Sequence, residues 1–294
     1  MQARHEKVIY ENDRGQRVEI AYSFPYFLQQ LLGADGTDAD ITKVKGVGQD
    51  GSTVTNVNLA DRELRVLASI KGNTKEEIAK HRAKLLQVFN PKVKGWLQYE
   101  YGSIKRRIRC QVEKAPVFSK QNRSFKYQDF LIDLLCPNPF WQDVAKTKAE
   151  IAIWRGALEF PLELVEEGIE VGFREPSLIV NIFNPGDVPC GMEIRFKALA
   201  TVVNPLLFNV NTREELKINK TMTAGEAIIV TTHFGNKRVE SWLNGVSTNA
   251  FNWLDLDSVF LQLDPGDNLL RYDAEEGLDN LEVDIYFAPQ YLGV

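Results

Sequence analysis

The clearest candidates for chemistry are side chains in the second half of the chain that would suit a sugar ligand. His233 opens a polar stretch that ends at Arg238, Trp242 follows it, and Trp253 lies a little further on. Sugar sites combine an exposed aromatic ring with fixed polar groups for the hydroxyls. Trp242, Trp253 and His233 are therefore candidate carbohydrate-binding residues, with a host glycan as ligand. The tryptophans also fit the core of a β-sandwich or an interface, which is the more ordinary interpretation.

Other patterns that carry chemistry are incomplete. Gly46–Gly51 fits G-x-G-x-x-G, but β-branched and polar residues follow it where a dinucleotide site needs a helix. The three histidines have no cysteine, histidine or paired carboxylate at metal-ligand spacing, and no G-x-S-x-G element is present. We therefore expect no catalytic residue, no metal site, no cofactor and no enzyme. A cell-wall hydrolase is retained only as a minor alternative.

Length and composition set the broad class. The chain has 294 residues, 44% of them hydrophobic and 26% charged, with a formal net charge of −5. These values predict a globular protein of two domains and disfavour a specific nucleic-acid partner. No stretch is apolar enough for a membrane span, and the charged N-terminus is not a secretory signal. Three widely spaced cysteines indicate a reducing compartment rather than a disulfide framework.

A strand followed by a bend lies near the middle of the chain. The alternation that ends at Cys136 predicts a buried strand, and two prolines follow one residue apart. Such prolines remove backbone donors and force the chain out of regular structure. Pro137, Asn138, Pro139 and Trp141 are therefore predicted to form the domain junction. The expected domains are residues 1–143 and 144–294.

The first half predicts an α+β domain with one helix packed on a sheet. Thr74 and Glu77 form a capping box, and Asn90-Pro91 ends the helix after Phe89. Helical spacing places Ile78, Arg82, Leu85, Leu86 and Phe89 on one face. The sequence of Phe24–Leu32 fits either a strand or a single helical turn. The other expected strands are Lys7–Tyr10, Arg17–Tyr22, Ile41–Val47, Val54–Leu59, Arg62–Lys71, Trp96–Tyr101 and Ile104–Glu113.

The second half predicts a β-sandwich of jelly-roll type, because short strands alternate with Gly/Pro turns and no helical period is evident. The last strand, Leu281–Phe287, could belong to either domain. The strands expected in this half are Ile151–Phe160, Leu162–Val165, Ser177–Phe183, Gly191–Leu199, Leu206–Asn209, Glu215–Ile218, Ala227–Thr232, Arg238–Leu243, Val259–Leu263, Asn268–Tyr272 and Leu281–Phe287.

Motifs spread over nearly the whole length resemble the distal tail (Dit) family of long-tailed bacteriophages. Each motif is short, and their order and spacing together carry the resemblance. The motifs are Gly48-Gln49-Asp50-Gly51, Asp61-Arg62, Asn90-Pro91-Lys92, Gly95-Trp96-Leu97, Pro116-Val117-Phe118, Cys136-Pro137-Asn138-Pro139-Phe140-Trp141, Asn184-Pro185-Gly186-Asp187, Asn204-Pro205 and Pro265-Gly266-Asp267-Asn268.

The resemblance implies a structural protein of the virion, located at the distal tip of the tail and synthesised in the cytoplasm of the bacterial host. It implies a homo-hexameric ring that connects the tail tube protein to the baseplate, or to a tail-fibre or tail-associated hub protein. The first domain would form the ring, and the second, with a galectin-like fold, would project outward. A carbohydrate-binding adhesin that recognises the host surface, with a host glycan or a receptor-binding protein as partner, is the alternative function. No sugar-binding residue is transferred from the family.

Overall fold

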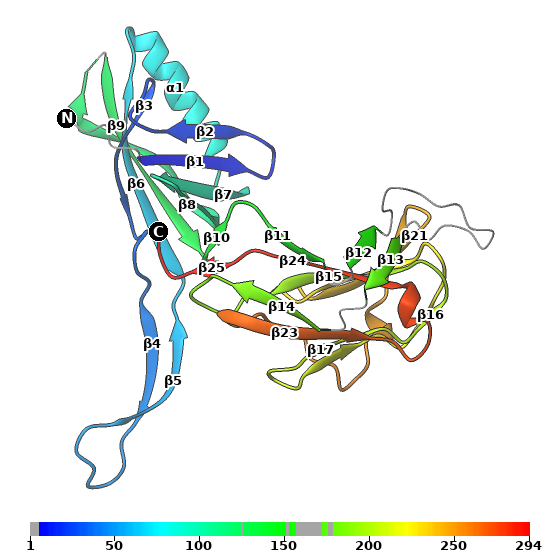
Figure 1. The fold of residues 1–294 in the computed structure, drawn as a ribbon. Coiled ribbons are helices and arrows are strands. Elements are labelled where there is room, and N and C mark those ends of the chain that lie inside the picture. Colours follow the sequence, from blue (N-terminus) through cyan, green and yellow to red (C-terminus); the bar gives the residue numbers. More distant parts are fainter. Residues whose placement is uncertain (1–5, 125, 151–152, 157–171, 176–178) are drawn as a thin grey trace. The chain divides into compact units, whose positions relative to one another are not determined.

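The structure, a computed structural model, describes residues 6–124, 126–150, 153–156, 172–175 and 179–294 (Figure 1). It is mainly β, as predicted. The chain forms two compact units. Unit 1 comprises Met1–Val144 and Gln290–Val294, and unit 2 comprises Ala145–Pro289. The division into domains at residues 143/144 stays a prediction, and the structure adds that the last five residues pack with unit 1.

Unit 1 is built on one antiparallel sheet of nine strands. Its strands are β1 (Glu6–Asn12), β2 (Arg17–Ile20), β3 (Tyr26–Leu32), β6 (Arg62–Lys71), β7 (Lys94–Tyr101), β8 (Ile104–Arg123), β9 (Tyr127–Cys136), β10 (Trp141–Asp143) and β25 (Gln290–Tyr291). The order is β2-β1-β7-β8-β9-β6-β3, with β10 pairing with both β8 and β25. The bounds predicted for β6 are confirmed, and Phe24–Leu32 resolves mostly as strand. Alternate β9 residues are buried, as predicted.

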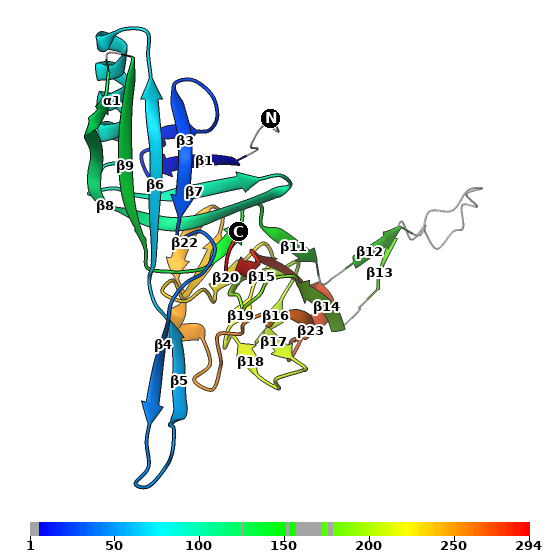
Figure 2. The same cartoon turned by 90° about the vertical axis from the view of Figure 1, so that its left-hand side faces the viewer.

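The helix α1 (Lys75–Val88) packs on this sheet (Figure 2). Its predicted cap is confirmed, because the Thr74 hydroxyl accepts the N–H of Glu77 at 3.2 Å. The buried side consists of Ile78, Leu85, Val88 and Phe89. Leu86 was predicted on that side and is 45% exposed. One residue turns a helix by about 100°, which carries position 86 away from the sheet when Leu85 faces it.

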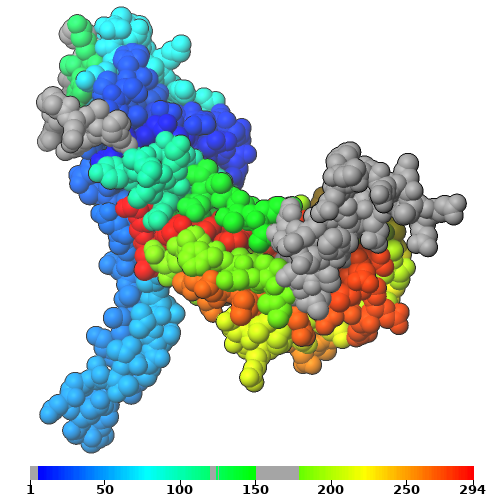
Figure 3. Space-filling view, in the orientation of Figure 1, coloured from blue at the N-terminus to red at the C-terminus, as the bar shows by residue number. Residues whose placement is uncertain are grey.

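A two-stranded hairpin extends from unit 1. Its strands β4 (Ala39–Val44) and β5 (Thr53–Leu59) pair only with each other among the described strands. Figures 1 and 2 both show it running out from the end of the sheet opposite α1, and in Figure 3 it is the light-blue rod. We call residues 39–59 the arm. The Gly46–Gly51 stretch lies in its turn and is followed by a strand, not by the helix of a dinucleotide site.

Unit 2 is a β-sandwich. One sheet has six strands in the order β11 (Thr147–Glu150), β24 (Leu281–Phe287), β15 (Met192–Ala198), β20 (Ala227–Thr231), β21 (Arg238–Leu243) and β22 (Val246–Asn249). The other has four, in the order β14 (Ile179–Asn184), β23 (Gly266–Asp273), β17 (Leu206–Asn209) and β18 (Glu215–Lys217). Buried side chains of both sheets share one core, for example Phe196 of β15 and Leu270 of β23. The last long strand, β24, thus belongs to unit 2.

Smaller elements complete unit 2. They are the strand pairs β12 (Ile153–Gly156) with β13 (Gly172–Glu175) and β16 (Val202–Val203) with β19 (Thr221–Met222), and the 3-10 turns η1 (Phe251–Trp253) and η2 (Leu278–Asn280). The galectin-like character of the sandwich stays a prediction.

Three of the strands expected in this half are either not formed or lie largely outside the described residues. The prediction of a strand at Val259–Leu263 is wrong, because this stretch makes one backbone hydrogen bond to Glu215 and an isolated bridge to Cys190 instead of a continuous ladder. Leu162–Val165 lies outside the described residues, as does Ile151–Phe160 apart from β12.

Candidate functional site

The predicted junction residues lie beside the base of the arm, within unit 1. Trp141 is fully buried, and its indole N–H donates to the carbonyl oxygen of Ala34 at 3.1 Å. The Asn138 side chain accepts the N–H of Phe140 at 3.1 Å, which closes a tight turn around Pro139. Ala34 lies between β3 and the first strand of the arm, so the bend and the arm base are held together.

A buried guanidinium organises the same region. Arg62, at the start of β6, is 2% exposed and donates only to backbone carbonyls. Its Nε reaches Pro139 at 2.7 Å, and its Nη2 reaches Leu292 at 2.5 Å. Its Nη1 lies 2.6 Å from the carbonyl oxygen of Gly33 and 3.2 Å from those of Ala34 and Gly36. Burial lowers the pKa of Arg62 from its ordinary value. Five carbonyls therefore compensate a charge that has left water.

A second arginine holds the C-terminal segment. The Arg106 guanidinium lies 3.5 Å above the centroid of the Tyr291 ring and donates to the carbonyl oxygen of Gly293. The Tyr291 hydroxyl donates to a carboxylate oxygen of Asp143 at 3.2 Å. A Cβ atom added at Gly293 would lie 2.0 Å from the carbonyl oxygen of Asp35, so no other residue fits without movement. The last residues are thus a fitted part of unit 1.

The arm is amphipathic although every residue of β4 and β5 except Leu59 is exposed. Ile41 lies directly opposite Val57, and Lys43 lies opposite Val54 across a bulge. Directly paired residues project to the same side of a hairpin. One side therefore presents Ile41, Val54 and Val57, each about half exposed, and the other is mainly polar. Isolated two-stranded hairpins have marginal stability in water, and exposed apolar surfaces of this kind are typical of sites that bind another protein surface.

The tip of the arm is an ordered turn. The N–H of Gln49 donates to the carbonyl oxygen of Gly46 at 3.2 Å. The Gln49 side chain accepts the N–H of Gly46 at 3.0 Å and donates to the hydroxyl of Thr53 at 3.2 Å. Gln49 is thereby occupied within the turn. Val47 is fully exposed at the tip, and Lys45 and Asp50 are exposed on either side of it.

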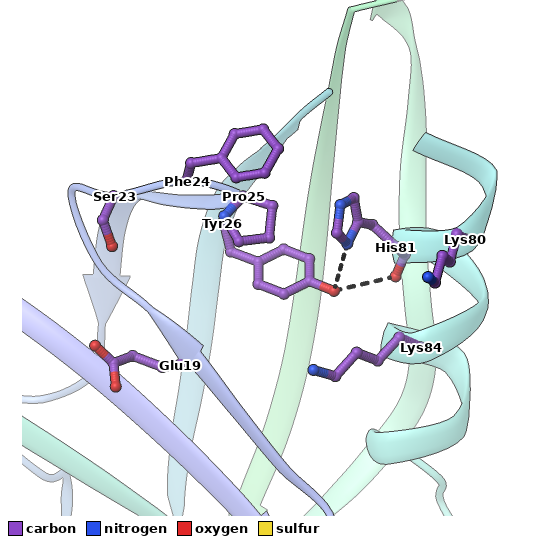
Figure 4. A pocket seen from close by; sticks show the side chains of 8 residues that line it. All are labelled: Glu19, Ser23, Phe24, Pro25, Tyr26, Lys80, His81 and Lys84. Carbon is purple, nitrogen blue, oxygen red and sulfur yellow. Dashed lines mark hydrogen bonds between the residues drawn. The ribbon is translucent and has the colours of Figure 1, made fainter. Parts of the chain in front are cut away.

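A pocket of about 390 Å³ lies between α1 and the segment that joins β2 to β3 (Figure 4). Lys80 and Lys84 form its helix side, Glu19 lies on the strand side, and Tyr26 stands between them. The Tyr26 hydroxyl lies 3.4 Å from Nδ1 of His81. Burial lowers the pKa of His81, and the nearby Lys84 and Lys80 lower it further while Glu77 opposes them.

The structure separates the three predicted sugar-binding residues. Trp242 is 40% exposed on β21 and pairs with Ala227, at the start of β20, whereas His233 follows the far end of β20. Trp253 packs against the sandwich core, with Nζ of Lys220 4.7 Å above its ring. The three do not converge on one pocket among the described residues.

A different pocket, of about 280 Å³, lies on β21 and β22. It is lined by Lys237, Arg238, Glu240, Ser247, Asn249 and Phe251. The Phe251 ring is 47% exposed, and Arg238 pairs with Glu240 at 3.4 Å. An aromatic ring beside donors and acceptors has the composition of a sugar site. The sequence pointed to the stretch that ends at Arg238 but not to Ser247 and Asn249, because β22 was not predicted and only its register with β21 brings Asn249 opposite Glu240.

Within the described ranges, no helix is long and apolar enough to cross a membrane. The described residues also contain no group of three or more His, Cys, Asp or Glu side chains placed to hold a metal ion.

Comparisons with known proteins agree with this architecture. Residues 13–136 match the family described as the phage tail protein RIFT-related domain, and residues 185–291 match the C-terminal domain of the siphovirus-type tail component. The fold is similar to the crystal structure of the Dit protein of phage SPP1, with a TM-score of 0.70 and 15% identity over 97% of this chain and 99% of that chain. The chain belongs to the distal tail protein family of long-tailed bacteriophages. It is accordingly a structural component of the phage tail, within the virion.

Other solved structures share the fold of this family member. A chain of the phage P2 baseplate, in its activated conformation with Ca, matches with a TM-score of 0.58 and 10% identity over 97% of each chain. A chain of the same baseplate with Sr matches with a TM-score of 0.56 and 8% identity over 96% of this chain and 97% of that one. Among curated protein sequences, none matches this chain.

The family motifs now acquire structural roles. Arg62 and the bend at Pro137–Trp141 were noted as separate motifs, and the structure joins them through the hydrogen bond to Pro139. The contribution of Leu292 and Gly293 was missed. In the sequence, only Gly293, two residues after Tyr291, could have indicated this contact, and a glycine by itself does not identify the residue that it approaches.

Proposed function

We propose that this distal tail protein assembles into a closed ring of six copies at the tail tip. The ring joins the tail tube protein to the baseplate or to a tail-associated hub protein, and it works as a scaffold without catalysis. Heterologous contacts that repeat through a closing rotation generate such a ring. Each contact must bury well over about 1,000 Å² to hold a permanent assembly.

The apolar side of the arm is the observation that carries this proposal. Ile41, Val54 and Val57 are exposed on a hairpin that no other described strand of unit 1 pairs with. A neighbouring copy that covers this side would remove apolar surface from water and stabilise the hairpin. One such arm for each copy supplies the repeated contact that a ring requires.

The test is the mass of the purified chain, measured by light scattering over a range of concentrations, with negative-stain imaging of the particles. We expect six copies for the wild type and a shift toward smaller species for the double variant Ile41→Thr, Val57→Thr. Val44→Thr is the matched control, because Val44 lies on the other side of the same hairpin and is equally exposed. A wild-type chain that stays monomeric at the highest accessible concentration would overturn the ring.

A second function, recognition of a host glycan, is favoured by the pocket on β21 and β22. Phe251 supplies a ring for stacking, while Arg238, Glu240 and Asn249 supply donors and acceptors for hydroxyls. Binding on a glycan array that disappears in Phe251→Ala and persists in Trp253→Ala would support this site. Trp242→Ala tests the exposed ring on β21, which lies opposite the pocket residue Ser247. No glycan binding by the assembled wild type would leave unit 2 with a purely structural role.

A further inference from the structure

We propose that the tip of the arm of one copy docks in the pocket between α1 and the β2–β3 segment of a second copy. This inference rests on the proposed ring and specifies which two surfaces meet in it. The tip presents Val47 between Lys45 and Asp50. The pocket presents the exposed Phe24 ring and the half-buried Pro25 between Glu19 and two lysines, and the buried Tyr26 forms part of its wall. Both the tip and the pocket therefore have an apolar centre with a positive and a negative side, and the two charge patterns can be matched.

The charges of the pocket have capacity for a partner. Neither Lys80 nor Lys84 forms an ion pair with another described residue, although both are exposed at the helix side. Glu19 shares Lys7, at 3.6 Å, with Glu100, at 3.4 Å. One cation between two carboxylates leaves Glu19 able to accept a second cation. Asp50 therefore fits the lysine side, and Lys45 fits the Glu19 side.

The apolar part of the pocket has one exposed side chain, Phe24, which is 57% exposed. The buried Tyr26 is held in place by its contact with His81 on the helix side of the pocket (Figure 4). Val47 is fully exposed in a turn whose shape is fixed by the hydrogen bonds of Gln49. A preformed tip that enters a preformed pocket loses little conformational entropy on binding.

The occupant has to be another copy, because the arm cannot reach the pocket of its own chain. The strand β6 begins beside the arm base and ends just before α1, and its ten residues span about 33 Å. The arm continues away from α1, from the opposite end of the sheet (Figures 1 and 2). Each copy therefore offers one tip and one pocket to different neighbours, which is the head-to-tail contact of a ring.

Charge exchange tests the contact. We expect Asp50→Lys alone and Lys84→Asp alone each to raise the concentration needed for half-assembly about tenfold, because like charges then face each other. The double variant should recover most of the loss. Lys75→Asp, on the first turn of the same helix and outside the pocket, is the matched control and should leave assembly unchanged. If the double variant shows only the sum of the two single losses, the proposed pair is wrong.

Disulfide trapping gives an independent readout. The three native cysteines are buried, so introduced thiols are the accessible ones. Val47→Cys mixed with Phe24→Cys, and oxidised by glutathione disulfide, should give a covalent dimer through a bond between the two introduced sulfur atoms, while two glutathione thiols are released. Leu86→Cys replaces Phe24→Cys as the control, because Leu86 is exposed on the neighbouring helix α1 outside the pocket. An intact hexamer without this cross-link overturns the docking site and leaves the ring standing. A monomer without it overturns both.

Discussion

Arg62 and Pro139 lie 77 positions apart in the chain and are joined by a 2.7 Å hydrogen bond from the guanidinium Nε to the carbonyl oxygen. The same side chain also holds the carbonyls of Gly33 and Leu292. One buried cation thus connects the arm base, the bend after β9 and the C-terminal segment. Loss of that cation should affect all three at once.

Replacing Arg62 by methionine is expected to destabilise unit 1 by about 3 kcal/mol or more, because five buried carbonyls lose their donor. The control is Arg65→Met on the same strand, where the side chain is 54% exposed and pairs with Asp133 at 2.6 Å. That change should cost much less stability, because exposed ion pairs contribute little to the free energy of unfolding. Denaturant unfolding, with hydrogen exchange of β6 and β9 to assign the transition, measures both. Similar losses in the two variants would contradict the role given to Arg62.

Replacing Gly293 by valine is expected to release the C-terminal segment, because its Cβ would overlap the carbonyl oxygen of Asp35. Hydrogen exchange should then accelerate in β25 and in the Gly33–Gly36 stretch. Gly36→Ala is the control, since an added Cβ there meets nothing within 4 Å. Unchanged exchange at β25 in the valine variant would show that the close approach is not a constraint in solution.

Acid should destabilise unit 2 through His233. Burial lowers its pKa below the ordinary 6.5, with a further lowering by Lys146 and a smaller opposing effect of Glu193. Below about pH 6.5 the unfolded state therefore binds more protons than the folded state, and the free energy of unfolding decreases as the pH decreases. His233→Gln should lose less stability than the wild type between about pH 7 and 5. His81→Gln, in unit 1, should leave the acid sensitivity of unit 2 unaltered.

Trypsin should report on whether the arm is covered. Lys43 and Lys45 are exposed near the tip, and exposed loop tips are preferred sites of cleavage. We expect cleavage there in diluted monomers and strong protection in the assembled ring. Peptide mapping by mass spectrometry over time distinguishes the two. Equal cleavage rates for ring and monomer would mean that the arm stays uncovered.

Local patterns predicted much of this fold. The alternation in Arg62–Lys71 gave the bounds of β6, and Thr74 with Glu77 located the start of α1. The contacts that local patterns did not predict are those between residues far apart in the chain. No local pattern shows that Arg62, an ordinary cation at the start of a strand, would be buried by segments from residues 33, 139 and 292. Asn249 was missed as a pocket residue for the same reason, since the strand register across β21 and β22 places it, and Phe251 follows it in the turn η1.

The pairing of β10 with β25 has a consequence for the evolution of the chain. Trp141 lies opposite Tyr291, so the polypeptide leaves unit 1 and re-enters it on adjacent strands. Insertions are tolerated where the two ends of the inserted segment start close together. We therefore expect that the span between residues 144 and 290 can be exchanged for another module without loss of the fold of unit 1.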